Sequence, residues 1–469
     1  MHLIMKKITH SRVLFSLIFI AALSANILAD NVDELVRTRM AEHHIPGAAI
    51  AVVVNGKVVK MKGYGLASVE FGVPVTPETV FEIGSVSKQM TAAAIMLLVQ
   101  DGKIDPDAKI STYLSGTPDQ WKDVSVRNLL THSSGIKSYS SLDGFELSNR
   151  LNAEQFIKKL SPYPLEFTPG EKNIYSNSGF NLLAFIVESV SKKPFMTFMR
   201  ERIFTPLGME HTTERDPQYI VMNRAAGYEW TNGHLAGRDG NLTNLIGAGS
   251  IVSTVGDIVK WNIALSGNKF LNDKSKQQIW TKFIFNDGSE SPYGFGWRLS
   301  NLRGHKIIGH TGQTAGFGAA NFRYADDKVF VIALTNLGEL GMGGMLASAI
   351  AKKYISSLSL RTVKAIADDN PELTQKLFNA FVSRLNQNPS EEMFSANYLK
   401  TLERPRTLAE TRRLAAFGNV GGFVLTEKRT GKNNIERVYR TEIGKKIFLI
   451  EFALDKENKI ISISVEEEE

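Results

Sequence analysis

Cysteine is absent from this chain of 469 residues. Disulfides, thiolate metal sites, iron–sulfur clusters and a cysteine nucleophile are therefore excluded. A strong charge of one sign is also missing, because 55 basic against 48 acidic residues leave a formal charge of +7, too little to indicate a nucleic-acid partner. The 43% hydrophobic and 22% charged residues are typical of a globular protein and argue against disorder and a multi-span membrane protein. The length predicts two or three domains.

Several catalytic sequence patterns are absent as well. No serine lies in G-x-S-x-G, the nucleophile turn of α/β-hydrolases, and no histidine pair forms the zinc motif H-E-x-x-H. The chain also lacks the phosphate-binding patterns G-x-x-x-x-G-K-[ST] and G-x-G-x-x-G after a strand. We therefore expect neither a metal nor another cofactor.

The first 29 residues are typical of a signal peptide. Lys6, Lys7 and Arg12 precede a 13-residue apolar stretch, and the small residue Ala29 precedes Asp30. A membrane-spanning helix needs about 20 apolar residues, so export with cleavage after Ala29 is favoured over a membrane anchor. We expect a periplasmic or secreted protein that has no membrane span after processing.

Strand patterns lie at both ends of residues 30–360, with helical periodicity between them. An apolar run over 48–54 meets Asn55-Gly56, a strong hairpin signal because both turn residues accept positive φ. The later strand patterns cover 293–299, 306–310, 318–324 and 328–335, and a helical pattern over 345–358 follows them. We expect a mixed α/β (α+β) fold in which one antiparallel sheet, flanked by helices, is interrupted by a helical insertion.

The tail of the chain is predicted to form a separate domain. Residues 361–371 are charged and break the pattern, which indicates a linker. Within 372–469, a helix over 373–385 precedes strand patterns at 422–429, 437–443 and 446–454, with a weaker fourth at 459–465. We expect a small C-terminal α+β accessory domain.

Residues 85–88 match S-x-x-K, which places a serine and a lysine on one face of a helix. The same spacing begins at Ser134, Ser189 and Ser266, so the motif alone decides little. Apolar residues at helical spacing follow Ser85, which places it at the positive N-terminal end of a buried helix. Ser189 ends a helix instead, and a glycine directly after each of the other two serines indicates a turn. Ser85 is the candidate nucleophile.

A serine hydroxyl needs a base to take its proton. Lys88 can act only when neutral, which requires a pKa lowered from about 10.4 to about 7–8, or about 4 kcal/mol from its surroundings. A tyrosine can share a proton with such an amine, and Tyr175-Ser176-Asn177 is the only Y-x-N in the chain. It is predicted to lie in a loop before a helix that begins near Phe180. Asn177 would hold a substrate amide or orient the lysine. The structural alternative is that Tyr175 is simply buried and that Asn177 belongs to a turn.

His310-Thr311-Gly312 is predicted to end a strand. A small residue there lets a substrate backbone approach, and the N–H of Gln313 would join that of Ser85 as an oxyanion donor, each worth about 2.7–4 kcal/mol. A structural histidine at the end of a strand is the alternative for His310.

The order and combination of these three motifs resemble the serine β-lactamase and penicillin-binding-protein superfamily, in particular class C-like, CubicO-type hydrolases. The resemblance covers roughly residues 30–360 and implies a serine β-lactamase-like fold. It also implies roles for Ser85 as the acylated nucleophile, Lys88 and Tyr175 as the proton-handling pair, Asn177 as a substrate contact, and His310, Thr311, Gly312 and Gln313 as the strand lining the cleft.

One departure from class C β-lactamases affects the expected substrate. Those enzymes carry lysine where this chain has His310, and a histidine is mostly neutral at pH 7, so recognition of a drug carboxylate is weakened. The H-x-G variant is typical of relatives that look like D-amino-acid peptidases and esterases. We expect an exported serine hydrolase that cleaves an amide or ester, most of all in D-amino-acid-containing peptides or small esters. The alternatives are a β-lactamase and a non-catalytic penicillin-binding or scaffold protein.

Other conspicuous residues have structural interpretations. His132 is predicted to cap a loop, and Trp261 and Trp297 to pack in the core or the cleft wall. Arg323, on a strand after the H-x-G, is a candidate for the positive charge that His310 lacks. Substrate choice is expected to depend on loops over 138–165 and 227–244, and the oligomeric state stays open.

Overall fold

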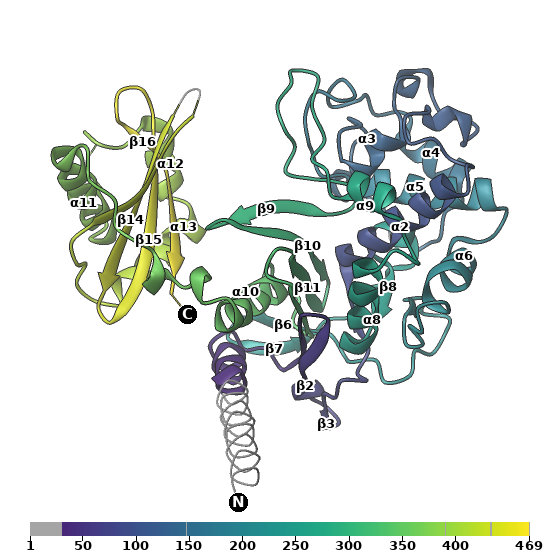
Figure 1. Cartoon of the computed structure of the whole chain (residues 1–469), viewed down its shortest axis with the longest axis horizontal. Coiled ribbons are helices and arrows are strands. Elements are labelled where there is room, and N and C mark those ends of the chain that lie inside the picture. Colours follow the sequence, from purple (N-terminus) through teal and green to yellow (C-terminus); the bar gives the residue numbers. More distant parts are fainter. Residues whose placement is uncertain (1–30, 147, 390, 432–433, 469) are drawn as a thin grey trace, which may run out of the picture. The chain divides into compact units, whose positions relative to one another are not determined.

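The computed structural model describes residues 31–146, 148–389, 391–431 and 434–468 (Figure 1). The predicted signal peptide lies outside these residues. The chain divides into two compact units, of which the first ends at Tyr354 and the second spans Ile355–Glu469. Within the described residues, no helix combines the length and apolar character needed to cross a bilayer.

The first unit is built on a seven-stranded antiparallel sheet with the order β3-β2-β1-β12-β11-β10-β9. Its strands are β1 (Gly47–Val54), β2 (Lys57–Ser68), β3 (Val73–Pro74), β9 (Arg298–Leu302), β10 (His305–Thr314), β11 (Phe317–Tyr324) and β12 (Val329–Thr335). β1 pairs with β12, so strands from both ends of the unit meet in one sheet, as predicted. The hairpin between β1 and β2 is also confirmed, because Asn55 and Gly56 have φ angles of 51° and 76°.

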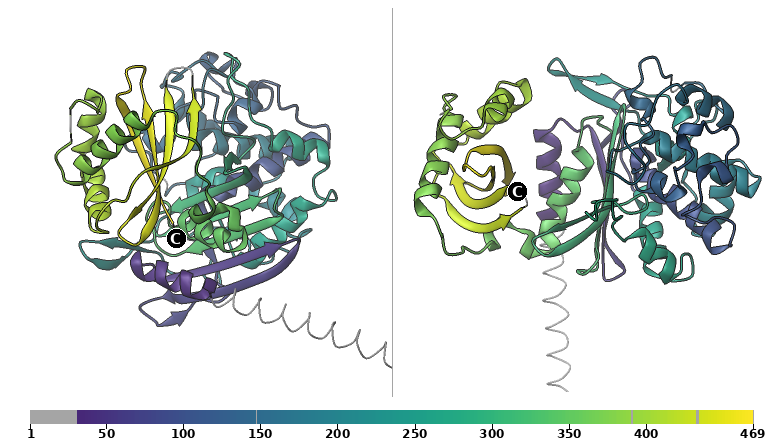
Figure 2. Two further views of the ribbon diagram at one scale, coloured as in Figure 1. Left: turned by 60° about the vertical axis from the view of Figure 1, so that its left-hand side comes forward. Right: turned by 90° about the horizontal axis from the view of Figure 1, so that it is seen from above.

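Helices cover both faces of this sheet (Figure 2). The helix over residues 31–42 and α10 (Met342–Tyr354) lie on one face, and α2 (Ser87–Gln100) and α8 (Val255–Ser266) lie on the other. Since both faces are covered, β1 and β12 are apolar along almost their whole length. α2 is buried from its first residue through Leu98, which explains its long apolar sequence.

The predicted helical insertion lies between the two groups of strands. It contains α3 (Val126–Leu130), α4 (Ala153–Leu160), α5 (Asn177–Ser191), α6 (Phe195–Met199), α7 (Ile246–Gly249) and α9 (Asp273–Ile279). Short strands complete it: β4 (Phe81–Glu82), β8 (Ile251–Ser253) and β5 (Thr213–Glu214) form one small sheet, and β6 (Tyr228–Thr231) and β7 (His234–Gly237) form another.

Two predicted elements of the first unit have different bounds in the structure. The strand expected over 293–299 begins only at Arg298, because Gly296 has a φ of 76° and its backbone packs against Lys88 of α2, where a Cβ would lie 2.5 Å from the lysine carbonyl oxygen. The helix expected over 345–358 is α10, which ends at Tyr354 and is followed by a 3₁₀ turn, Ser356–Leu358.

The second unit has its own helices, sheet and core. The helices α11 (Pro371–Leu385), α12 (Ala396–Leu402) and α13 (Pro405–Ala415) precede an antiparallel meander of β13 (Val424–Thr430), β14 (Ile435–Ile443), β15 (Lys446–Leu454) and β16 (Ile460–Glu467). The sequence predicted α11 and the four strands but not α12 or α13, whose apolar patterns are short. Residues 361–371, predicted to be a linker, contact this unit: Ile366 N–H donates to Leu425 (2.9 Å), and Asp368 and Asp369 pair with the buried Arg437.

Candidate active site

Ser85 lies in a 3₁₀ turn, Gly84–Val86, that leads directly into α2. Gly84 has a φ of 49°, and a Cβ on it would lie 2.7 Å from the backbone nitrogen of Gln313, so this turn requires glycine. The competing S-x-x-K matches lie elsewhere: Ser189 is in the last turn of α5, Ser134 precedes a turn glycine, and Ser266 ends α8. The structure therefore gives Ser85 the helix-start position that the sequence predicted.

Lys88 is fully buried, and its Nζ lies within hydrogen-bond distance of three oxygens. These are Ser85 Oγ at 3.0 Å, Asn177 Oδ1 at 2.8 Å and the carbonyl oxygen of Ala248 at 2.7 Å. Burial holds the pKa of Lys88 well below its ordinary value. A neutral amine has two N–H donors and one lone pair, so the amide and carbonyl oxygens take the two donors. The lone pair is then left for the proton of Ser85.

Tyr175 approaches the same serine oxygen. Its Oη donates a hydrogen bond to Ser85 Oγ at 2.8 Å, and burial raises the pKa of the phenol above its ordinary value. Ser85 Oγ therefore lies between an uncharged amine and a protonated phenol. Asn177 is the first residue of α5, which begins three residues earlier than predicted, and its amide oxygen orients Lys88.

The H-x-G segment lies within β10 rather than at the end of a strand, because β10 extends to Thr314. β9 pairs only with residues 305–309 of β10, so among the described strands the segment 310–314 has one edge without a strand partner. A Cβ on Gly312 would lie 1.9 Å from the carbonyl oxygen of Ile83 and 3.1 Å from the nitrogen of Ser85. Only glycine lets the strand approach the nucleophile this closely.

Alternate residues of this segment point to opposite faces of the sheet. The methyl group of Thr311 faces Gly344 of α10, and the side-chain amide of Gln313 donates to the carbonyl oxygen of Gly338 at 2.7 Å. These two predicted substrate residues can therefore serve a ligand in the cleft through their backbone groups. The backbone of Gln313 lies against Gly84, as an oxyanion donor beside Ser85 requires.

His310 is buried and neutral. Burial lowers its pKa to about 3. Its Nε2 lies 2.8 Å from Tyr293 Oη, and its Nδ1 lies 2.5 Å from the carbonyl oxygen of Thr311. The carbonyl can only accept, so Nδ1 carries the proton and Nε2 accepts from the tyrosine. His310 therefore offers no positive charge to a substrate carboxylate.

The prediction that Arg323 supplies the positive charge missing at His310 is wrong. Its guanidinium is buried against α8, where it donates to Asn262 and Ser266, and it stacks 4.1 Å from the ring centre of Phe330. Arg323 lies on the same sheet face as His310, but its side chain fills the space beneath α8 and stabilises the core.

Arg298, which the sequence analysis missed, is an exposed cation beside the site. It lies on β9 opposite Gly309 of β10. Burial is the main cause of the pKa shifts of Tyr175 and His310. The positive charge of Arg298 lowers the pKa of both groups to a smaller extent, so the electric field of Arg298 reaches the site. Within the described part of the chain, no acidic side chain pairs with Arg298. Its place beside the H-x-G is visible only once the pairing of β9 with β10 is known.

Two other side chains near the site had structural interpretations. His132, expected to cap a loop, lies against the ring of Tyr175, and Tyr293, expected in a strand, donates to His310. Trp261 and Trp297 are buried in the core, within the predicted alternatives.

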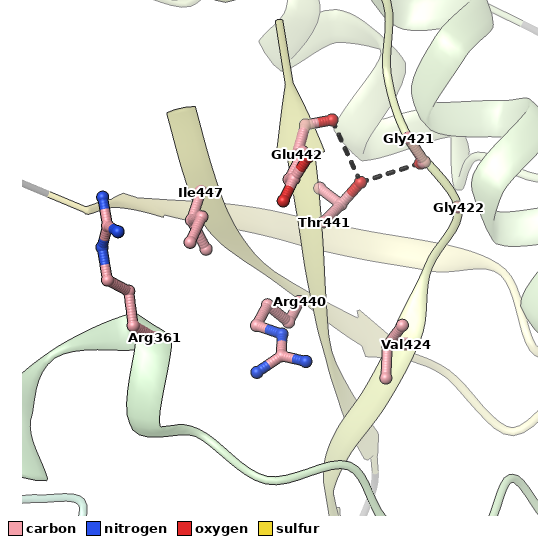
Figure 3. A pocket seen from close by; sticks show the side chains of 8 residues that line it. All are labelled: Arg361, Gly421, Gly422, Val424, Arg440, Thr441, Glu442 and Ile447. Atoms are coloured by element: carbon pink, nitrogen blue, oxygen red, sulfur yellow. Dashed lines mark hydrogen bonds between the residues drawn. The ribbon is translucent and has the colours of Figure 1, made fainter. Parts of the chain in front are cut away.

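A separate cavity of about 460 Å³ lies in the second unit (Figure 3). Both arginines of its lining have partners: Arg440 donates to the carbonyl oxygen of Val363 at 2.6 Å, and Arg361 lies 3.9 Å from Glu468. No serine, histidine or lysine lines it. The nucleophile, amine and phenol gathered at Ser85 make that site the better candidate.

Residues 32–353 match the family model described as Beta-lactamase. The chain belongs to this family. It is 28% identical over 337 residues to a D-aminopeptidase of Brucella ovis, which covers 70% of this chain and 62% of that protein. The chain thus spans about 62% of the length of this relative.

Solved structures share the fold of this Beta-lactamase family member. An octameric penicillin-binding protein homologue from Pyrococcus abyssi has a TM-score of 0.61 at 22% identity, covering 93% of this chain and 100% of that one. A D-amino acid amidase from Ochrobactrum anthropi, complexed with L-phenylalanine amide, has a TM-score of 0.61 at 23% identity, covering 71% and 98%. At these identities the likeness shows the fold.

Proposed function

We propose that this protein is a serine hydrolase that forms an acyl-enzyme on Ser85. The observation that carries the proposal is the position of Ser85 Oγ, 3.0 Å from the buried Lys88 amine and 2.8 Å from the Tyr175 phenol. The neutral amine takes the serine proton while Oγ attacks the substrate carbonyl carbon. The N–H groups of Ser85 and Gln313 stabilise the oxyanion that forms.

Collapse of this intermediate completes acylation. The bond from carbon to the leaving nitrogen or oxygen breaks, the leaving group takes a proton from Tyr175, and Lys88 returns its proton to the phenol. Water then attacks the ester and gives its proton to the same pair of groups, so that the acid product leaves and Ser85 regains its hydrogen. Every proton is accounted for within the chain and the substrate.

We propose an amide next to a D-amino acid as the leading substrate, with small esters second. Relatives named D-aminopeptidase and D-amino acid amidase support this class. The neutral, buried His310 also supports it, because this position supplies no cation for the carboxylate of a β-lactam.

The test compares turnover of D-alanyl and L-alanyl p-nitroanilide, p-nitrophenyl acetate and nitrocefin by the wild type and by Ser85→Ala. We expect the D-anilide to be preferred over the L-anilide, and Ser85→Ala to lose all turnover. Activity retained by Ser85→Ala would overturn the proposal. Nitrocefin as the best substrate would indicate a β-lactamase, and covalent labelling by a fluorescent penicillin without any turnover would indicate a binding protein.

We also propose that the protein is exported and cleaved after Ala29. The basic residues followed by a short apolar stretch support this. Amino-terminal sequencing of protein recovered outside the cytoplasm should begin at Asp30, and full-length chain confined to the cytoplasm would contradict export.

A further inference from the structure

A cluster of buried rings surrounds Tyr175. The ring of His132 lies 4.2 Å from that of Tyr175, 4.6 Å from that of Tyr293 and 5.1 Å from that of Phe180, measured between ring centres. Tyr293 in turn donates to His310, whose ring lies 6.1 Å from Tyr175. The phenol that contacts Ser85 is therefore held against rings from several separate segments.

His132 also binds the backbone on both sides of Tyr175. Its carbonyl oxygen accepts a hydrogen bond from Ile174 N–H at 3.1 Å, and its Nδ1 accepts one from Ser176 N–H at 3.1 Å. Next to it, the carbonyl oxygen of Thr131 accepts from the side chain of Asn173 at 2.7 Å. These bonds join segments that lie more than 40 residues apart in the sequence, so the imidazole holds the loop that carries Tyr175.

The state of His132 fits this role. Because Nδ1 accepts from a backbone N–H, it must be unprotonated, and burial keeps the pKa of His132 well below its ordinary value. The residue also has a φ of 56°, a left-handed conformation that costs a residue with a Cβ about 1 kcal/mol or more. Such backbone strain persists where the surrounding structure requires it.

We infer that His132 is a positioning residue that sets the distance and direction of the Tyr175 phenol toward Ser85. It touches no reacting atom and acts through the backbone at 174 and 176 and through its ring. The inference rests on the proposed proton-handling role of Tyr175. A displacement of about 1 Å in a catalytic group can lower a rate by about 100-fold.

The test is a double-mutant cycle on the full chain, using the rate of Ser85 acylation by p-nitrophenyl acetate. His132→Phe keeps a ring but loses the acceptor for Ser176, and we expect acylation to slow by about 30- to 100-fold through kcat, with KM changed little. His132→Asn keeps an acceptor and tolerates positive φ, so it should stay within about fivefold of the wild type. In a Tyr175→Phe background, His132→Phe should cost less than about threefold.

Each way of failing is separate. No acylation of Ser85 in the wild type would remove the proposed function, and full activity of Tyr175→Phe would remove the role of the phenol. If both of these hold and His132→Phe still imposes its whole cost in the Tyr175→Phe background, only the positioning role is overturned. Should His132→Phe not fold, as judged from thermal unfolding, the same cycle with His132→Leu decides.

Discussion

Burial acts on Lys88 and Tyr175 in opposite directions and leaves both uncharged. It lowers the pKa of the amine and raises that of the phenol, because a charge in either group would lose its hydration. A neutral amine can accept the serine proton and a neutral phenol can donate one. The two proton-handling roles therefore follow from one physical cause, the dry surroundings of Ser85.

Arg298 should govern the recognition of substrates that carry a carboxylate. We expect Arg298→Gln to slow acylation by a penicillin at least about tenfold, because a charge-assisted hydrogen bond is worth about 1.5–3 kcal/mol, and to leave the neutral ester p-nitrophenyl acetate unchanged. Acylation rates with the two reagents provide the measurement. Arg303, a second arginine of the β9–β10 hairpin region, gives the control variant Arg303→Gln, and equal slowing of both reagents would contradict the prediction.

His310 should make the protein sensitive to acid. Its pKa is about 3 in the folded chain and about 6.5 in the unfolded chain. Between these values the unfolded state binds more protons, so stability falls as pH falls from 6.5 toward 3, by up to about 1.4 kcal/mol per pH unit. His310→Gln should shift the midpoint of acid unfolding, followed by near-ultraviolet circular dichroism, to lower pH. The same shift from the control His234→Gln, at an exposed histidine of β7, would count against this account.

At the level of elements, β10 and the turn at Ser85 are in direct backbone contact. Gly312→Ala would place a methyl group 1.9 Å from the carbonyl oxygen of Ile83, which forces the strand and the turn apart. We expect kcat/KM to fall at least about 100-fold, because the oxyanion donors and the nucleophile move relative to each other.

Gly256→Ala in α8 is the matched control for Gly312→Ala. An added Cβ there meets its nearest neighbour at 3.7 Å, and alanine favours a helix. This variant should retain full activity and equal or greater thermal stability. Steady-state kinetics on both variants decide, and an active Gly312→Ala enzyme would show that the close approach is dispensable.

Local patterns in the sequence predicted the elements whose signals are local. The Asn55-Gly56 turn and the apolar strands β11 and β12 are examples, as is the start of α2 after Ser85. The prediction of a strand before Arg298 was wrong. The backbone of Gly296 packs against α2, and no local pattern encodes this contact. The places of Arg298, His132 and Arg323 likewise depend on which strand or loop lies beside them, a property of the folded chain.

The whole molecule consists of two units with separate cores, and every residue of the candidate site belongs to the first. The ion pairs of Arg437 lie in the second unit and include no residue of the candidate site. Asp368→Ala combined with Asp369→Ala leaves the buried Arg437 without carboxylate partners. Losing both carboxylates takes the ion pairs away from a buried guanidinium and so destabilises this unit.

We expect this double variant to lower the unfolding temperature of the second unit while the acylation rate of Ser85 stays within about twofold of the wild type. Differential scanning calorimetry and acylation kinetics measure the two effects. Glu457→Ala, at an exposed glutamate of the same unit, is the control. A parallel loss of acylation would show that the second unit supports the site.

The most direct test of the central claim is the pH dependence of Ser85 acylation, followed by intact-protein mass spectrometry with p-nitrophenyl acetate. If the neutral Lys88 amine activates Ser85, a single acetyl group accumulates at a rate that rises with pH and levels off well below 10.4, the ordinary lysine pKa. Ser85→Ala should gain no acetyl group under the same conditions. An adduct on Ser85→Ala, or a rate that is still rising through pH 10, would contradict the account.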